Sequence, residues 1–356
     1  MIAATPLLRV LMLVQLLLLV LAAPASAQSL EWKHLSLAPR DQHAMTYDSA
    51  RGVTVLFGGV NGFSFGATVN SETWEWNGAT WTVRAVGGPS LRRAHAMVYD
   101  SARGMTVLFG GRNGPTTIDD TWEWNGTAWT QRAVGSPSRR YGHGMAYDAG
   151  RGVTVIFGGD GPTNPLDDTW EWNGTVWTQR AVSGPSVRRA HAMTYDAARG
   201  NSVLFGGLVG STVNGETWEW NGGVWTLRTV SSPSPRYRHS MAYDAARGVS
   251  VLFGGGTLTS ANGETWEWNG TAWTQISVSG PSPRYSHAMA YDADRGVTVL
   301  FGGHDGSGFS GETWEWNGIT WTQRAVSGPS ARAYHAMVYD SARGVCVLFG
   351  GLERLS

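Results

Sequence analysis

The chain has 356 residues, and its 27 Lys and Arg side chains balance its 27 Asp and Glu side chains, so the formal net charge is zero. Charged residues make up 15% of the chain, compared with about 25% in average soluble proteins, and no basic excess is present that would attract nucleic acid or a membrane surface. Cys346 is the single cysteine, which excludes an intrachain disulfide.

Residues 1–27 have the layout of a secretory signal peptide. Arg9 precedes an apolar run from Val10 to Ala23, and the small residues Ala25-Ser26-Ala27 follow it. The run is shorter than the roughly 20 apolar residues that a membrane span needs. We therefore expect cleavage before Gln28 and a secreted or periplasmic mature chain without membrane insertion. A retained membrane anchor is the alternative.

A histidine-containing segment recurs along the mature chain. The first step between these histidines is 52 residues and every later step is 48 residues; the histidines are His43, His95, His143, His191, His239, His287 and His335. A period in this range indicates an array of one supersecondary unit, and an all-strand unit of this length is typical of a propeller. We expect a single domain over residues 28–356.

Each repeat reads as four strands. In the repeat that begins at His95, residues 95–100 alternate with period two and residues 105–109 form a dense apolar run. The paired glycines Gly110-Gly111 end that run, and a variable loop follows. Residues 121–124 and 129–134 form the last two strands, joined at Asn125-Gly126 by a tight hairpin turn.

The register of that hairpin can be predicted. If Trp124 faces Trp129, then Trp122, Trp124 and Trp129 share one face, and Glu123 lies diagonal to Arg132 on the other. Six copies carry this cluster and hold eighteen of the nineteen tryptophans. We expect these indoles to pack between neighbouring sheets, with stacking on sugar rings as the alternative.

Paired glycines, a tryptophan downstream of them and Pro-x-x-Arg before the next copy together resemble kelch repeats, across residues 28–356. The resemblance implies an all-β, kelch-type β-propeller with blades of four antiparallel strands around a central axis. Seven copies of the first strand predict seven blades, the last one incomplete and closed by an N-terminal strand near Trp32. Six blades are the alternative, because no Thr-Trp-Glu-Trp segment follows Gly350-Gly351.

Repeated charged and aromatic positions are expected to have structural roles. An arginine lies three residues before each repeated histidine and an acid precedes each third strand, which predicts an ion pair within each blade; Asp100 and Arg103 and their counterparts predict another across the first turn. In the type repeat the structural residues are Arg92, His95, Gly110, Gly111, Trp122, Trp124 and Trp129. Histidines at equivalent places in separate blades would face neighbouring blades, so we expect no metal site, the alternative being a metal ring.

Two sets of positions differ from copy to copy: the loops after the paired glycines, and the two residues between the arginine and the histidine. In an antiparallel four-stranded blade, both sets emerge at the same end of the propeller. This face is the predicted recognition surface, and its candidate ligand-binding residues are Phe63, Phe65, Arg93, Tyr141, Arg189, Tyr237, Arg238, Tyr285, His304, Phe309 and Tyr334. Freely drifting surface loops are the alternative.

The sequence favours a monomeric binding module for a protein or glycan, without a cofactor, a catalytic residue or a nucleic-acid partner. An enzyme on a kelch propeller is the rival hypothesis, either a sialic-acid mutarotase-like isomerase or an oxidase like galactose oxidase. The copper site of that oxidase includes a Cys–Tyr crosslink, whereas Cys346 occupies a mid-strand position held by Thr106 in a sister repeat. A purely structural extracellular module is a third possibility.

Overall fold

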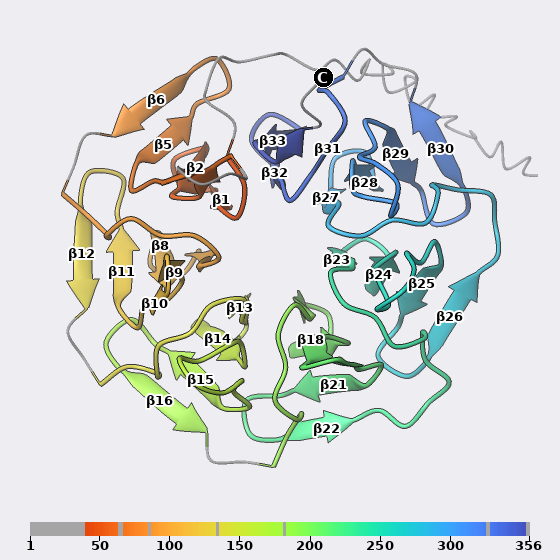
Figure 1. Cartoon of the computed structure of the whole chain (residues 1–356), viewed down its shortest axis with the longest axis horizontal. Coiled ribbons are helices and arrows are strands. Elements are labelled where there is room, and N and C mark those ends of the chain that lie inside the picture. Colours follow the sequence, from red (N-terminus) through yellow and green to blue (C-terminus); the bar gives the residue numbers. More distant parts are fainter. Residues whose placement is uncertain are drawn as a thin grey trace, which may run out of the picture.

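The computed structural model describes residues 40–62, 67–84, 87–132, 135–180, 183–324 and 328–353. Every regular element in these ranges is a β-strand, and none of them contains a helix long and apolar enough to cross a membrane. The strands form antiparallel sheets arranged in a ring around an axis (Figure 1). The chain is a β-propeller.

Six complete blades have four strands each. In every one, the first strand is innermost and the fourth lies at the rim (Figure 1). The blades are β1 (Ala44–Asp48), β2 (Val53–Phe57), β5 (Thr73–Trp76) and β6 (Trp81–Arg84); β7 (Ala96–Asp100), β8 (Met105–Phe109), β11 (Thr121–Trp124) and β12 (Trp129–Arg132); β13 (Gly144–Asp148), β14 (Val153–Phe157), β15 (Thr169–Trp172) and β16 (Trp177–Arg180); β17 (Ala192–Asp196), β18 (Asn201–Phe205), β21 (Thr217–Trp220) and β22 (Trp225–Leu227); β23 (Ser240–Asp244), β24 (Val249–Phe253), β25 (Thr265–Trp268) and β26 (Trp273–Ile276); β27 (Ala288–Asp292), β28 (Val297–Phe301), β29 (Thr313–Trp316) and β30 (Trp321–Arg324).

Short ladders supplement the blades. Three of them lie inside the variable loops, where the sequence predicted no strand, and a fourth joins the segment before the last histidine to residues after the last glycine pair. They are β3 (Val60–Asn61) with β4 (Thr68–Val69), β9 (Arg112–Asn113) with β10 (Thr116–Thr117), β19 (Leu208–Val209) with β20 (Thr212–Val213), and β31 (Arg332–Ala333) with β34 (Leu352–Glu353).

The prediction of seven blades, the last one incomplete, was wrong in its count, since the structure has six blades of four strands, as in the six-blade alternative. The remaining place in the ring holds a two-stranded sheet, β32 (Ala336–Asp340) with β33 (Val345–Phe349) (Figure 1). The copy that begins at His335 has no Thr-Trp-Glu-Trp segment from which a third strand could form. The expected closing strand near Trp32 and the expected signal peptide lie outside the described residues.

The two-stranded sheet joins the last complete blade to the first. The Ala342 amide donates to the Tyr47 hydroxyl over 3.0 Å, and the Gly351 amide donates to the Arg40 carbonyl over 2.9 Å. Equivalent bonds join other neighbouring blades, for example from the Ala102 amide to the Tyr147 hydroxyl. The ring of first strands is therefore closed within the described residues.

The paired glycines occupy positions where a side chain cannot fit. Gly110 and Gly111 have φ values of 68° and 99°, in the left-handed region that favours glycine. A Cβ atom on Gly110 would lie 2.6 Å from the carbonyl oxygen of Arg140 in the next blade, and one on Gly111 would lie 2.9 Å from that of Arg93. The glycine pair lets successive blades approach each other through their backbones.

The indoles pack between blades, as predicted. Trp124 and Trp129 are paired across their hairpin and belong to one core cluster with Val55 and Phe57 of the preceding blade, where the Trp129 ring packs edge-on against Phe57 with centroids 5.4 Å apart. Trp124 is fully buried and Trp129 is 7% exposed. Burial of an aromatic side chain of this size stabilises the fold by several kcal/mol, at about 25 cal/mol per Å² of apolar surface. The third indole of the cluster, Trp122, is only partly buried.

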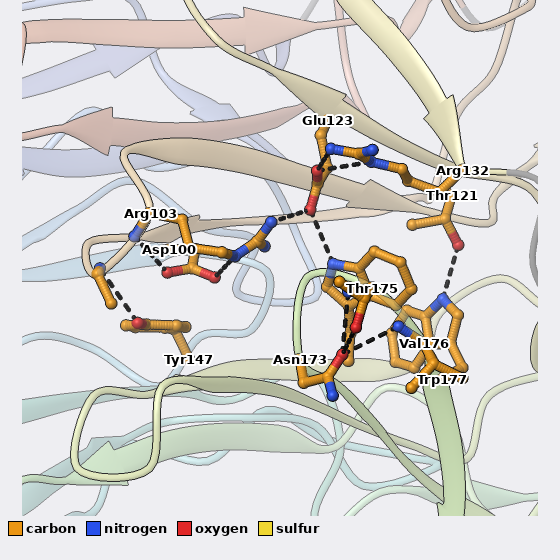
Figure 2. A network of polar contacts seen from close by, with 12 residues as sticks. Asp100, Arg103, Thr121, Glu123, Arg132, Tyr147, Asn173, Thr175, Val176 and Trp177 are labelled. Carbon is orange, nitrogen blue, oxygen red and sulfur yellow. Dashed lines mark hydrogen bonds and ion pairs between the residues drawn. The ribbon is translucent and has the colours of Figure 1, made fainter.

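A polar network at the same interface contains the predicted contact of Glu123 with Arg132 and adds bonds to the next blade that were not predicted. Glu123 accepts hydrogen bonds from Arg103 and Arg132 of its own blade and from the Trp172 indole of the next blade at 2.8 Å (Figure 2). The Trp177 indole donates to the Thr121 hydroxyl at 2.7 Å. Each interface between two complete blades thus combines apolar packing with buried indole hydrogen bonds.

The predicted ion pairs within blades are present. Buried Arg92 bonds to Asp120 at 2.5 Å and to the Gly110 carbonyl at 3.1 Å. It therefore links the connection that leads into the blade's first strand to the start of its third strand. The turn pair of Asp100 and Arg103 recurs in all seven copies. In the last copy the acid comes from a different place, because Arg332 pairs with Glu353 of β34.

Candidate ligand-binding face

The two variable sets of the sequence pair with each other residue by residue. In each complete blade, the residue after the buried arginine forms a β-bridge with the residue after the glycine pair, as Arg93 does with Arg112 and Tyr285 does with His304. The Arg93 amide donates to the Arg112 carbonyl at 3.0 Å, and the Arg112 amide donates back at 2.9 Å. Both sets therefore lie at one end of the propeller, held in register by backbone bonds.

A ring of backbone hydrogen bonds surrounds the axis at this end. From the second copy on, the residue just before each repeated histidine donates its amide to the carbonyl of its counterpart in the preceding blade, over 2.8–3.3 Å; the chain of donors and acceptors runs through Gln42, Ala94, Gly142, Ala190, Arg238, Ser286 and Tyr334. All seven have φ between 53° and 63°. Non-glycine residues adopt this conformation at a cost on the order of 1 kcal/mol each, which the inter-blade bonds offset.

A cavity of about 560 Å³ opens inside this ring. Three small ring residues, Ala94, Gly142 and Ala190, line it together with the larger ring residues Arg238 and Tyr334. The remaining lining residues are Asp41, Gln42, Val60, Gly62, Ala67, Arg93, Arg112, Tyr141, Arg189 and Leu352. Its size falls within the roughly 300–1,000 Å³ of small-molecule sites.

Arginine dominates the charge of the cavity. Arg112 lies over the Tyr141 ring, with the guanidinium carbon 4.4 Å from the ring centroid. Arg189 lies 3.2 Å from the Asp160 carboxylate. Burial, followed by the neighbouring charge of Arg112, lowers the pKa of Arg93.

Asp41 is the one carboxylate in the cavity lining. It is 3% exposed, and one of its oxygens has no hydrogen-bond partner among the described residues. Its other oxygen accepts from the Gln42 amide at 2.8 Å. Burial raises the pKa of this carboxyl group, against the opposing effects of Gln42 and Arg93.

A row of aromatic side chains continues from the cavity. Arg238 donates to the Tyr334 hydroxyl at 2.8 Å, and its guanidinium carbon lies 5.5 Å from the Tyr237 centroid. Ring centroids are 5.3 Å apart for Tyr285 and His304, and 5.2 Å apart for His304 and Phe309. All of these rings are partly exposed.

The predicted site residues fall into three groups. The cavity lining includes five of them, namely Arg93, Tyr141, Arg189, Arg238 and Tyr334. The adjoining aromatic row includes Tyr237, Tyr285, His304 and Phe309. Phe63 and Phe65 lie outside the described residues.

Sequence reasoning did not name Arg112 or Asp41 as site residues. Both belong to the variable sets, and the β-bridge that pairs those sets would have singled them out: Arg112 is bridged to Arg93, and Asp41 occupies the Arg93 position of the first blade. A residue immediately after a glycine pair is therefore as good a candidate for ligand binding as a residue just after the buried arginine.

The repeated histidines do not face this cavity. The His95 ring packs edge-on against Phe57 of the preceding blade, with centroids 5.6 Å apart, and its equivalents do the same around the ring. Within the described ranges, no three His, Cys, Asp or Glu side chains are placed to hold a metal ion. Cys346 is unpaired and opposite Tyr339 in its sheet, and burial raises the pKa of its thiol to about 12.

Comparison with known proteins adds no relative: no protein-family model matches the chain, and a search of the curated proteins finds no match.

Proposed function

We propose that this chain is an exported, kelch-type propeller that binds a protein or glycan ligand in the cavity at the end of its axis, without catalysing a reaction. The observation that carries the proposal is the coincidence of variability and geometry. The cavity is lined by residues from the positions that differ from blade to blade, whereas the repeated residues make packing contacts and ion pairs. Rigid scaffolds that carry variable loops are a common basis for recognition.

The backbone ring supports this proposal because it pre-organises the cavity. Six hydrogen bonds connect the seven ring residues, so ligand binding would not have to order the cavity's rim. A pre-formed site avoids part of the entropic cost of association. Freely drifting loops would not require such a frame.

A variant that fills the cavity tests the proposal. Ala190→Tyr places a large side chain in the cavity without new backbone strain, because Tyr334 already has φ 61° at the equivalent ring position and Ala190 has φ 53°. Ligands found by glycan-array and pull-down screening should bind this variant at least about tenfold more weakly, a loss of 1.4 kcal/mol. The measurement is a dissociation constant by titration calorimetry.

Ile319→Tyr is the matched control. Ile319 is 73% exposed in the turn between β29 and β30, at the opposite end of the blade from the variable loops, and it does not line the cavity, so this variant should bind like the wild type. Equal thermal midpoints would show that both variants are folded. Unchanged binding by Ala190→Tyr, or no ligand of either class in the screens, would contradict the proposal.

Export has its own test. The signal-peptide pattern of residues 1–27 predicts that the protein made in a secreting host leaves the cytoplasm and begins at Gln28. Mass spectrometry of the purified protein measures this N-terminus. Recovery of the intact chain starting at Met1 from membranes would support the retained anchor instead.

A further inference from the structure

The cavity carries a surplus of positive charge that its own residues do not neutralise. Four arginines line it, Arg93, Arg112, Arg189 and Arg238, against the single carboxylate of Asp41. Arg189 has Asp160 beside it. Arg93 and Arg112 have no ion-pair partner among the described residues, and the Nε atom of each is buried without a hydrogen-bond acceptor there.

Two guanidinium groups in this position are costly unless an anion joins them. Arg93 and Arg112 are bridged backbone to backbone, so their side chains start from adjacent points of one wall. A buried nitrogen that lacks an acceptor destabilises a protein, because its lost hydration is not replaced. Guanidinium groups bind carboxylates and other oxyanions through charged, geometrically matched hydrogen bonds.

The aromatic row indicates what the anion is attached to. Tyr334 lines the cavity and connects through Arg238 to Tyr237, and partly exposed Tyr285, His304 and Phe309 continue outward. The C–H faces of sugar rings pack on aromatic rings, and hydroxyl groups of a sugar can bond to tyrosine hydroxyls. An extended acidic peptide would instead need positive charges along the aromatic row, and His304 is the only ring in that row that can carry a positive charge.

We propose that the cavity binds the anionic group of an acidic glycan, held by Arg93 and Arg112, while neighbouring sugar rings pack on the aromatic row. This inference rests on the proposed binding function and adds the chemical class of the ligand. Asp41 opposes the anion, because its carboxylate lies in the same cavity. Removing an arginine charge should therefore weaken the binding of the anion, and removing the Asp41 charge should strengthen it.

Calorimetric titration of the full chain with defined probes tests the inference. The probes are oligomers of galacturonate, glucuronate and mannuronate, their neutral methyl esters, a sulfated galactan oligomer, inorganic phosphate and sulfate, and a penta-glutamate peptide. We expect at least one acidic oligomer to bind, its neutral form to bind at least about tenfold more weakly, and added salt to weaken the binding. Comparing carboxylated with sulfated oligomers identifies which anion is preferred.

Charge variants locate the binding. Arg93→Gln and Arg112→Gln should each weaken the acidic oligomer at least about tenfold, the range for a hydrogen bond to a charged group, and Asp41→Asn should tighten it. Arg139→Gln makes the same change of charge outside the cavity, at a side chain that is 51% exposed beside Asp119, and should leave the affinity unchanged. Thermal midpoints separate lost binding from lost folding.

The outcomes distinguish this inference from the proposed function. If neutral glycans or proteins bind the cavity, as judged by Ala190→Tyr, and acidic glycans do not, the inference is wrong and the binding function stands. Equal affinity for penta-glutamate or for free phosphate would also overturn it, since the sugar rings would then contribute nothing. If nothing binds in the cavity, both proposals fail.

Discussion

Acidification from about pH 7.5 to about pH 5.5 is expected to lower the free energy of unfolding by about 9 kcal/mol, which is most of the stability of a typical domain. The cause is the set of seven repeated histidines. Burial, with a smaller contribution from the adjacent buried arginine, lowers the pKa of His43, His143, His191, His287 and His335 to about 3, and burial places that of His95 and His239 well below the ordinary value.

The direction follows from which state takes up protons. In the folded protein these histidines stay neutral down to about pH 3, whereas in the unfolded chain they protonate near pH 6.5. Stability is therefore lost as the pH falls from about 6.5 toward 3, by roughly 1 kcal/mol per histidine in the first unit. Acids whose folded pKa is lowered, such as Asp168 and Glu216, lose stability only below about pH 5 and so titrate in a separate window.

Urea unfolding followed by tryptophan fluorescence measures the effect. The slope of the unfolding free energy against pH near 5.5 should correspond to an uptake of about six protons. His191→Leu should reduce this uptake by about one proton; this histidine is slightly more exposed than the others beside Gly144, but both of its ring nitrogens are buried. A flat profile, or ring titration near pH 6.5 in the folded protein by nuclear magnetic resonance, would contradict the prediction.

The fold was largely predictable because its determinants are local and repeated. The alternation at residues 95–100, the Asn125-Gly126 turn and the pairing of Trp124 with Trp129 involve neighbours in sequence, and the structure confirms the strands and the register. The ion pair of Arg92 with Asp120 was predictable for a different reason. Two opposite charges that recur at fixed spacing in every copy are most simply explained by each other.

Features that depend on the spacing between blades were not predictable. No sequence pattern places the Trp172 indole against Glu123, which lies 49 residues earlier. The left-handed conformation of Ala94 and Ala190 is equally hidden, because alanine has no preference for it. The blade count depended on the missing third and fourth strands of the last copy. The number of first strands gives no information about them.

The candidate site was predictable in its location but not in its chemistry. Variability between copies marked the end of the propeller at which the cavity opens, because the repeat fixes which strand ends meet there. Which variable side chains form a cavity depends on the small ring residues Ala94, Gly142 and Ala190, whose neighbours around the axis are distant in sequence. The adjacency of Arg93 and Arg112 likewise appears only once the β-bridge between the two variable sets is known.

Glu171→Gln is expected to lower the free energy of unfolding by about 2–3 kcal/mol, toward the lower end of the cost of breaking a buried ion pair because its arginine partners are partly exposed. Glu171 is 2% exposed and accepts from Arg151 at 2.6 Å, from Arg180 at 2.5 Å and from the Trp220 indole of the next blade at 2.7 Å. Glutamine keeps the shape but leaves Arg180 without a counter-charge, whereas Arg151 keeps its ion pair with Asp148 at 2.7 Å.

The chain contains its own control for this prediction. In the fifth blade Ile276 stands where Arg180 stands in the third, and Glu267 there accepts from one arginine, Arg247, and from the Trp316 indole. Its side chain is 13% exposed, so solvent screens it more. Glu267→Gln should therefore cost about half as much as Glu171→Gln.

A double variant isolates the charge effect from the loss of packing. Arg180→Ile copies the natural arrangement at Ile276 and removes the guanidinium group that Glu171→Gln leaves uncompensated, so combining the two should cost about 1 kcal/mol less than the sum of the single changes. Urea midpoints of the four proteins, measured at one pH above 7, give this coupling. Strict additivity, or equal costs at Glu171 and Glu267, would mean that the indole hydrogen bond, present in both blades, and not the paired arginines, makes this carboxylate important to the interface.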